Sequence, residues 1–143
     1  MTSITGVPSS TSIASRRSRP LAAILAEDGL ANGEIDPLYR PGLEGLEGFS
    51  DVAVLTWLDR SPRDLIVQKP RHAAQARGVF ALRSPARPNP VGLHVVRLLA
   101  VDAASGLLRL EAIDVLDGTP VIDVKPYYAA TDAIPDATRP DRA

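Results

Sequence analysis

The sequence contains no cysteine, only two histidines and no long apolar run. Without cysteine, the protein can form no disulfide, thiolate nucleophile or cysteine-ligated zinc or iron–sulfur centre. The two histidines lie in unrelated surroundings, so we expect no bound metal. No apolar stretch approaches the roughly 20 residues of a membrane span, and the N-terminus lacks the apolar core of a signal peptide. We therefore expect a soluble, cytoplasmic protein that does not bind a membrane.

Familiar catalytic signatures are absent as well. We find no Ser/His/Asp set, no phosphate-binding P-loop and no Gly-x-Gly-x-x-Gly dinucleotide motif. What remains is a chain of 143 residues, 45% hydrophobic and 23% charged, which is typical of one globular domain. A functional site must therefore be sought in its charge distribution, turns and loops.

The net charge of −1 hides an uneven distribution of charged residues. Residues 21–59 carry one base and eight acids, whereas residues 60–97 carry eight bases and a single acid, Asp64. Residues 1–20 hold three bases and no acid, and residues 98–143 hold four bases and eight acids. A stretch as basic as 60–97 is typical of a surface that binds an anionic ligand, nucleic acid included. The alternative is that the acidic flanks fold over it and pair with it.

The chain divides into three predicted parts. Residues 1–20 are rich in Ser, Thr and Arg and have too little apolar surface to offset their ordering entropy, so we expect a flexible segment. Within it, Ile4 to Val7 is compatible with a short strand, and the missing acids also fit a transit-type peptide. Residues 21–128 have the apolar and turn patterns of a folded domain. Residues 129–143 are rich in Ala, Asp and Pro, which predicts a loose tail.

The domain is predicted to be mainly β. Asp51 to Asp59 is β-branched or apolar on both faces, which predicts a central strand. Residues 92–101 and 107–115 are predicted to pair as a hairpin, because the turn residues Ser105 and Gly106 lie between them. Shorter strands are predicted at Asp64 to Gln68, Val79 to Leu82 and Val121 to Val124, while Leu21 to Leu25 is either a strand or a helical turn.

Little amphipathic helix accompanies these strands. Leu43, Leu46 and Phe49 recur at a spacing of three, which predicts one helical turn packed on the core. The stretch between Leu25 and Tyr39 is interpreted as a connection. Several short strands joined by tight turns favour a small antiparallel β-barrel or a β-sandwich, with short helical segments and a Pro-rich loop.

The Pro-rich loop is the feature around which the domain is organised. Three prolines between residues 85 and 90 fix the backbone and remove amide donors, so neither a helix nor a central strand can form there. The loop carries the polar side chains of Arg83, Arg87 and Asn89. A stiff loop presents such groups with little ordering entropy left to lose on binding. It is therefore either a recognition loop or a crossover whose arginines are only solvated.

Three further places hold polar groups suited to binding. The turn from Leu116 to Pro120 offers a carboxylate, a hydroxyl and a glycine amide for a ribose, an amine or a backbone, although Asp-Gly is also a common hairpin turn. Asp59 and Arg60 follow the predicted central strand and either orient a ligand or form a surface ion pair. His94 lies among apolar residues and is either a satisfied core residue or a base.

Two of these regions resemble a known family. Gly78 to Gly92 (GVFALRSPARPNPVG) and Asp117 to Pro126 (DGTPVIDVKP) are similar, in the same order, to the two signature blocks of the TsaA-like family. Residues 43–50 and 55–60 also resemble family segments, so the similarity extends from Leu43 to Tyr128. The family includes S-adenosylmethionine-dependent methyltransferases that modify threonylcarbamoyladenosine beside the tRNA anticodon. The resemblance implies a small β-barrel that dimerises and binds S-adenosyl-L-methionine near the subunit interface.

The resemblance also implies which residues contact the cofactor. Arg83 and Leu93 are the contacts expected from the first block, and Asp117 to Pro120 those from the second. Asp59-Arg60 stands where many members have His-Arg, Leu82 where Thr is frequent, and Ser18 to Pro20 is the nearest counterpart of a family Pro-Arg-Gln segment. The full predicted cofactor set is Asp59, Arg60, Phe80, Arg83, Arg87, Asn89, Leu93, Leu116, Asp117, Gly118, Thr119 and Pro120.

The resulting hypothesis is an S-adenosylmethionine-dependent methyltransferase that N6-methylates a threonylcarbamoyl-modified adenosine in tRNA. Methyl transfer from a sulfonium depends largely on positioning, so it requires no catalytic triad. Expected partners are a second copy of the chain and tRNA. The altered N-terminal segment and Asp59 motivate an alternative, a cofactor-binding or regulatory module without transfer activity. The resemblance to longer bacterial tRNA enzymes leaves the methyl acceptor open, so methylation of a small molecule or a protein is a further alternative.

Overall fold

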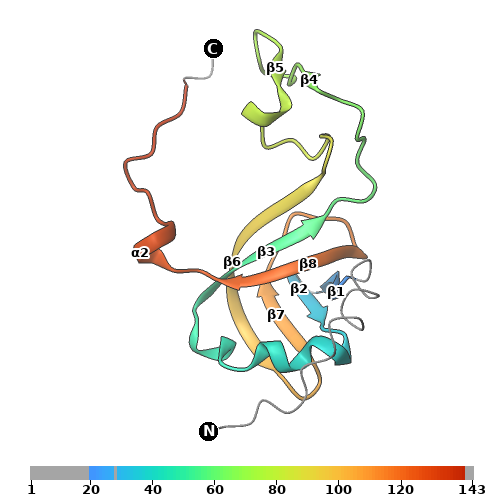
Figure 1. The fold of residues 1–143 in the computed structure, drawn as a ribbon, viewed down its shortest axis with the longest axis vertical. Coiled ribbons are helices and arrows are strands. Elements are labelled where there is room, and N and C mark those ends of the chain that lie inside the picture. Colours follow the sequence, from blue (N-terminus) through green and yellow to red (C-terminus); the bar gives the residue numbers. More distant parts are fainter. Residues whose placement is uncertain (1–19, 28, 141–143) are drawn as a thin grey trace, which may run out of the picture.

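The computed structural model describes residues 20–27 and 29–140. Six strands form a closed barrel in the order β1-β2-β7-β6-β3-β8, and all neighbours in it are antiparallel (Figure 1). They are β1 (Ala22–Glu27), β2 (Leu30–Glu34), β3 (Asp51–Trp57), β6 (Val91–Asp102), β7 (Leu107–Glu111) and β8 (Thr119–Pro126). The prediction of a mainly β fold is confirmed, and of the two predicted architectures the barrel is the one formed.

β3 is the central strand that the sequence predicts. Its residues alternate in burial, because Val52, Val54 and Thr56 point into the barrel and are at most 1% exposed. β-branched side chains of this kind pack well on a pleated surface. β3 pairs with β6 on one side and β8 on the other, so it holds the two longest strands together.

β6 and β7 form the predicted hairpin. Its turn ends at Gly106, whose φ of 76° lies in the left-handed region that favours glycine. The predicted end of the second strand at residue 115 is wrong, because β7 ends at Glu111. Glu111 is paired with Leu30, the first residue of β2, and beyond this point that side of the barrel offers no further partner strand.

Other local predictions were wrong where tertiary pairing decides the structure. The connection expected between Leu25 and Tyr39 contains β2, a strand of poor β-formers (Leu-Ala-Asn-Gly-Glu) that exists because it closes the barrel between β1 and β7. The strand expected over residues 79–82 is a 3-10 helix, η3 (Val79–Ala81). The strand expected over residues 64–68 is reduced to β4 (Val67–Gln68), which pairs only with β5 (Arg77–Gly78).

Two 3-10 helices cover one end of the barrel. η1 (Pro37–Leu43) and η2 (Leu46–Gly48) bury Leu43 and Leu46 against the core, so the predicted anchors are confirmed, although in two helices instead of one turn. Phe49 packs edge to face on Tyr128, with 5.7 Å between ring centroids. Residues 58–90 project from the opposite end of the barrel (Figure 1).

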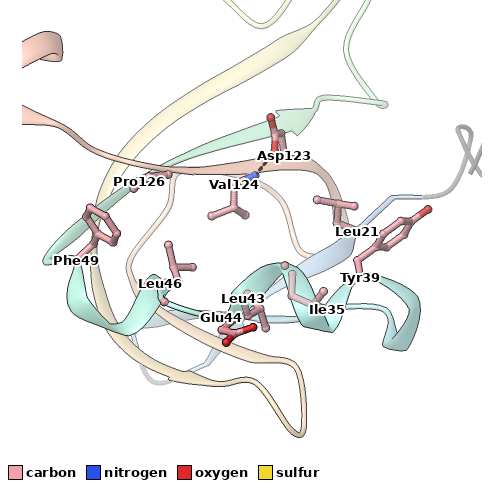
Figure 2. A pocket seen from close by; sticks show the side chains of 12 residues that line it. Leu21, Ile35, Tyr39, Leu43, Glu44, Leu46, Phe49, Asp123, Val124 and Pro126 are labelled. Atoms are coloured by element: carbon pink, nitrogen blue, oxygen red, sulfur yellow. Dashed lines mark hydrogen bonds between the residues drawn. The ribbon is translucent and has the colours of Figure 1, made fainter. Parts of the chain in front are cut away.

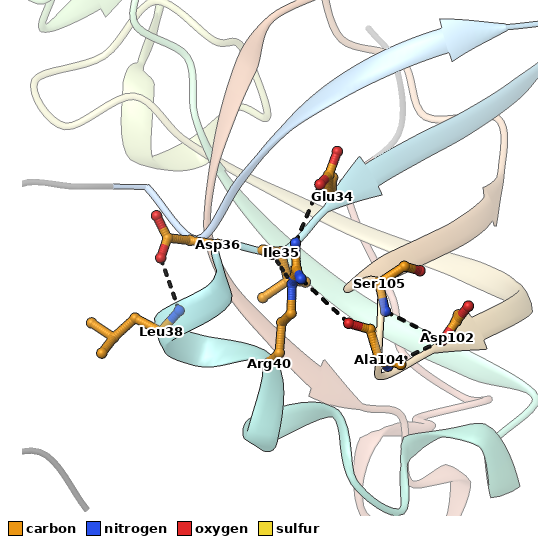
Figure 3. Close-up of polar contacts among 8 residues, drawn as sticks. All are labelled: Glu34, Ile35, Asp36, Leu38, Arg40, Asp102, Ala104 and Ser105. Carbon is orange, nitrogen blue, oxygen red and sulfur yellow. Dashed lines mark hydrogen bonds and ion pairs between the residues drawn. The ribbon is translucent and has the colours of Figure 1, made fainter.

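Arg40 fastens η1 to the β6–β7 turn (Figure 3). Its Nε donates to the carbonyl oxygen of Ile35 at 3.0 Å, Nη1 donates to that of Ala104 at 3.3 Å, and Nη2 pairs with Glu34 at 3.2 Å. A guanidinium provides enough donors to bind three acceptors at once, here two at the end of β2 and one in the β6–β7 turn. Gly106 lies directly against this arginine, so the turn and the helix are packed as one unit.

Replacing Gly106 with alanine is expected to lower the free energy of unfolding by about 2–3 kcal/mol. A Cβ here would lie 2.7 Å from the Ile35 carbonyl oxygen, and the residue would have to keep its positive φ. Chemical denaturation measures the effect. Gly48→Ala is the matched control, because its Cβ would meet nothing within 4 Å. Equal losses in the two variants would contradict the proposed close packing at Gly106.

The chain beyond β8 leaves the barrel through α2 (Ala129–Asp132), and residues 129–140 are all exposed (Figure 1). Residues 1–20 were predicted to form a flexible segment, and of these only Pro20 is among the described residues. The short strand considered for Ile4 to Val7 also lies outside the described residues. Among the residues that are described, no helix has the length and apolar character needed to span a membrane.

Candidate functional site

A cavity of about 860 Å³ opens at the end of the barrel from which residues 58–90 project. Its walls come from three distant segments, namely residues 58–61 after β3, residues within 83–94 in the Pro-rich loop and early β6, and residues within 114–119 before and at the start of β8. The volume falls in the usual range of small-molecule sites, roughly 300–1,000 Å³. Eight of the twelve predicted cofactor residues line it: Asp59, Arg60, Arg83, Arg87, Asn89, Leu93, Leu116 and Thr119. The other four, Phe80, Asp117, Gly118 and Pro120, do not.

The Pro-rich loop is shaped, as predicted, and Arg87 does much of the shaping. Its Nη1 donates to the carbonyl oxygens of Leu82 and Ser84 at 2.9 and 3.1 Å. Its backbone N–H donates to the Pro62 carbonyl oxygen at 3.2 Å. Arg87 is thus turned partly inward. Arg83 differs, because it is exposed, lines the cavity and makes no hydrogen bond or ion pair with another described residue.

Arg63 joins the segment after β3 to the Pro-rich loop. Its Nε donates to the Pro88 carbonyl oxygen at 2.7 Å, and Nη2 donates to Oδ1 of Asn89 at 3.1 Å. The guanidinium carbon also lies 5.3 Å from the centroid of the Trp57 ring, a cation–π contact. Sequence reasoning missed this role, because Arg63 is one of eight bases in the stretch and nothing local marks its partners 25 residues away.

The Asp117 turn is fastened to β1. Oδ1 of Asp117 accepts a hydrogen bond from the Ala26 N–H at 2.9 Å, and the Gly118 N–H donates to the Ile24 carbonyl oxygen at 2.8 Å. Gly118 has a φ of 83°, as tight turns often require. Within the turn, buried Thr119 is the residue that reaches the cavity. The turn therefore has a structural function in the barrel in addition to any contact with a ligand.

Asp59 and Arg60 are both exposed on the rim of the cavity. The surface ion pair considered for them is not formed, because neither pairs with another residue in the described part of the chain. With Arg83, they provide charged groups of both signs that no described residue neutralises. A zwitterionic ligand requires such a combination.

His94 is not a plain core residue. It is half-buried, lines the cavity, and its Nε2 lies 2.9 Å from Oγ1 of Thr56, with which it forms a hydrogen bond. Burial lowers the pKa of His94 below its usual value; nearby Asp114 opposes this effect and Arg83 adds to it. Gly92 leaves the room for this pair, because a Cβ there would overlap Thr56 Oγ1 and lie 2.7 Å from His94 Nε2.

Among the described residues, the acidic flanks form no ion pair with the basic stretch 60–97. Within residues 20–27 and 29–140, the ion pairs are Arg40 with Glu34 and Lys125 with Asp123. Neither includes a base from residues 60–97. Of the two predicted explanations, the described residues therefore favour a basic surface available to an anionic ligand.

A second cavity, of about 400 Å³, lies at the opposite end of the barrel, between the 3-10 helices and β8 (Figure 2). Its walls are mainly apolar, with Leu21, Leu46 and Val124 among them. The carboxylate of Asp123 is already engaged, by the Val124 N–H at 2.9 Å and by Lys125 at 3.1 Å. With few polar groups converging on it, this cavity is a weaker candidate than the one beside the Pro-rich loop.

Residues 9–133 match a family model, that of the tRNA-methyltransferase O N-terminal domain. The chain belongs to this family. The resemblance to TsaA-like proteins seen in the two signature blocks is thereby confirmed. A crystal structure of TrmO from Pseudomonas aeruginosa is similar as well, with a TM-score of 0.65 and 34% identity over 84% of this chain and 59% of that one.

Curated relatives of this TrmO-type domain differ in how specific their names are. A protein of Methanothermobacter thermautotrophicus, named a probable S-adenosyl-L-methionine-binding protein, is 47% identical over 70% of this chain and 71% of its own length. The tRNA (adenine(37)-N6)-methyltransferase of Escherichia coli is 40% identical over 76% of this chain, which spans 50% of that enzyme. A probable S-adenosyl-L-methionine-binding protein of Archaeoglobus fulgidus is 45% identical over 73% of this chain, which spans only 28% of that protein.

Proposed function

We propose that the chain is an S-adenosylmethionine-dependent methyltransferase that N6-methylates a threonylcarbamoyl-modified adenosine in tRNA. The main observation behind the proposal is that the predicted cofactor residues come together in space. Eight of the predicted cofactor residues, in three segments spread from Asp59 to Thr119, meet in a single cavity of suitable size. Membership of the TrmO family supports the reaction class, and the name of the Escherichia coli relative supports the acceptor.

The side chains of the cavity suit S-adenosylmethionine. Leu58, Leu93 and Leu116 provide apolar surface for an adenine ring. Arg83, which no described residue pairs with, offers its guanidinium to a carboxylate, and Asp59 offers a carboxylate to an amine. When bound there, the cofactor supplies a methyl group activated by a sulfonium.

One contribution of the chain to the reaction is positioning. In-line displacement gains most of its rate from holding the reacting groups in a fixed geometry. The prolines and Arg87 fix the shape of the Pro-rich loop, and Arg63 holds that loop against the end of β3. The site is therefore built on segments with little freedom left to lose.

The projecting residues 58–90 are proposed to bind the tRNA. Lys69, Arg71 and Arg77 lie on this projection, and none of them pairs with an acid in the described part of the chain. Bases of this kind meet phosphates and release counterions, so binding falls steeply with salt. Action on tRNA is also the reason that we propose a cytoplasmic location.

A second copy of the chain is proposed to cover the outer face of β6. Val91, Leu93, Val95 and Leu99 lie on this face and are 39–55% exposed, with Arg97 between the last two. An exposed, largely apolar stripe of this kind is typical of an interaction site. Because Leu93 also lines the cavity, such an interface would lie beside the cofactor site.

Val95→Lys is expected to convert the dimer to a monomer, because it buries a charge in the interface. Sedimentation equilibrium measures the mass. Leu25→Lys, on the outer face of β1 and 57% exposed, is the matched control and should stay dimeric. A monomeric wild type, or a Val95→Lys variant that remains a dimer, would refute the proposed interface.

The second candidate function is a cofactor-binding module without transfer activity. Two observations favour it: Asp59 stands in place of the family's usual His, and some relatives are named only as S-adenosylmethionine-binding proteins.

To decide between the enzyme and the module, the protein is incubated with methyl-labelled cofactor and tRNA that carries threonylcarbamoyladenosine, at low and high salt. Label in the N6-methylated nucleoside, lost as salt rises, supports the proposed enzyme. Cofactor binding without transfer supports the module, and transfer only to small molecules or proteins would overturn tRNA as the acceptor.

A further inference from the structure

His94 is a titratable group in the cavity wall that the cofactor assignment does not use. It comes from β6, next to the Pro-rich loop, and it lines the same cavity as Asp114, whose charge influences it from the segment before β8. Nε2 is hydrogen-bonded to Thr56, whose side chain is fully buried. Nδ1 has no hydrogen-bond partner among the described residues. The ring is thus held at one nitrogen and available at the other.

Methylation of an exocyclic nitrogen must release a proton, an argument that rests on the proposed function. The acceptor nitrogen forms a bond to the methyl carbon as the bond from that carbon to sulfur breaks, and the electron pair of the broken bond goes to sulfur. The N–H proton then has to leave. The lone pair of a carbamoylated adenine nitrogen is delocalised into the ring and the carbonyl, so a base that takes the proton during bond formation lowers the barrier.

We propose that His94 is this base. Its Nδ1 accepts the N–H proton of the acceptor, while Nε2–H donates to Thr56 Oγ1 and holds the ring in the tautomer that leaves Nδ1 unprotonated. A hydroxyl can accept from Nε2–H in both the neutral and the protonated ring, so the ring need not move during the reaction. Gly92 is required because any larger residue would displace this hydrogen-bonded pair.

The charges around the ring suit proton uptake. Burial, the largest influence, and then Arg83 favour the neutral ring, so the pKa of His94 lies below its usual value and the base is unprotonated at neutral pH. Asp114 favours the protonated ring and would stabilise the imidazolium once it forms. Among the described residues, the other charged groups that line the cavity are Asp59 and Arg60, after the end of β3, and Arg87, in the Pro-rich loop.

The first test uses nuclear magnetic resonance of the histidine rings. The chain has only two histidines, and His72→Gln assigns both signals. We expect the pKa of His94 to lie below the usual value of a free histidine, and its ring carbon shifts to report the Nε2–H tautomer. A His94 pKa at or above the usual histidine value, or a proton carried on Nδ1, would overturn the proposal without any activity measurement.

The second test compares rates of methyl transfer to tRNA. His94→Gln is expected to slow transfer about 10²- to 10⁴-fold and to remove the acidic limb of the pH profile, with cofactor affinity unchanged within about threefold. Asp114→Asn should shift that limb to lower pH, because it removes the charge that raises the pKa of His94. Arg109→Ala, on β7 and outside both the cavity and the projection, should match the wild type. An active wild type with an equally active His94→Gln overturns only the base, whereas an inactive wild type overturns the proposed function and the base together.

Discussion

Replacing Arg83 with alanine is expected to weaken S-adenosylmethionine binding about 10- to 100-fold, because it removes a charge-assisted hydrogen bond to the ligand's carboxylate. Arg83 lines the cavity, and no acid in the described part of the chain competes for it. The loss should therefore be seen in binding and not in folding. Isothermal titration calorimetry gives the affinity, and thermal denaturation of the free protein gives the stability.

Two further variants test whether the loss of affinity is due to the Arg83 guanidinium itself. Arg83→Lys keeps the charge but loses the planar fork, so an intermediate affinity is expected. Arg109→Ala removes an exposed arginine on β7 whose hydrogen bond goes to Asn32, outside the cavity, and should bind the cofactor like the wild type. An Arg83→Ala protein with wild-type affinity would show that the carboxylate is bound elsewhere.

Replacing Gly92 with alanine is expected to lower the free energy of unfolding by about 1–3 kcal/mol and to abolish the Thr56–His94 hydrogen bond. The added Cβ would overlap Thr56 Oγ1 and lie 2.7 Å from His94 Nε2. Thr56 has no exposed surface and lies on the central strand, so it has no room to withdraw. Denaturation measures the stability, and the histidine resonances report the lost hydrogen bond.

A double-mutant cycle tests whether the clash with Thr56 causes the loss of stability in Gly92→Ala. Adding Thr56→Ala to Gly92→Ala removes the overlapping hydroxyl, so part of the stability should return, and the two changes should be strongly non-additive. Gly78→Ala is the control, since a Cβ there would meet nothing within 4 Å. Additive losses in the double variant would mean that the clash with Thr56 is not what makes Gly92 necessary.

Much of the candidate site could be predicted because its motifs are local. Three prolines determine a loop whatever surrounds them, and Asp117-Gly118 determines a turn, which Gly118 forms with a φ of 83°. The family resemblance then assigned side chains to a common ligand. Phe80 is the least supported of these assignments, since it is 87% exposed on η3 and does not line the cavity.

What the sequence missed are contacts between segments far apart in the chain. Arg63 with Asn89 and Thr56 with His94 each join residues more than 20 positions apart, and no local pattern distinguishes these residues from their neighbours. The inward orientation of the Arg87 side chain could not be predicted either, because it depends on where two loop carbonyls lie once the loop has folded. Each of these contacts shapes the cavity.

The sequence by itself determined the strands with strong apolar or alternating patterns, the turns at Gly106 and Gly118, the stiff loop and the family. These depend on backbone restrictions and burial, which act over a few neighbouring residues. The tertiary structure alone decided that the strands close into a barrel, that the weak segment Leu30–Glu34 becomes a strand, and that Thr56 and Gly92 accommodate His94. The reason is that backbone pairing and close packing across the barrel supply free energy that local propensity does not contain.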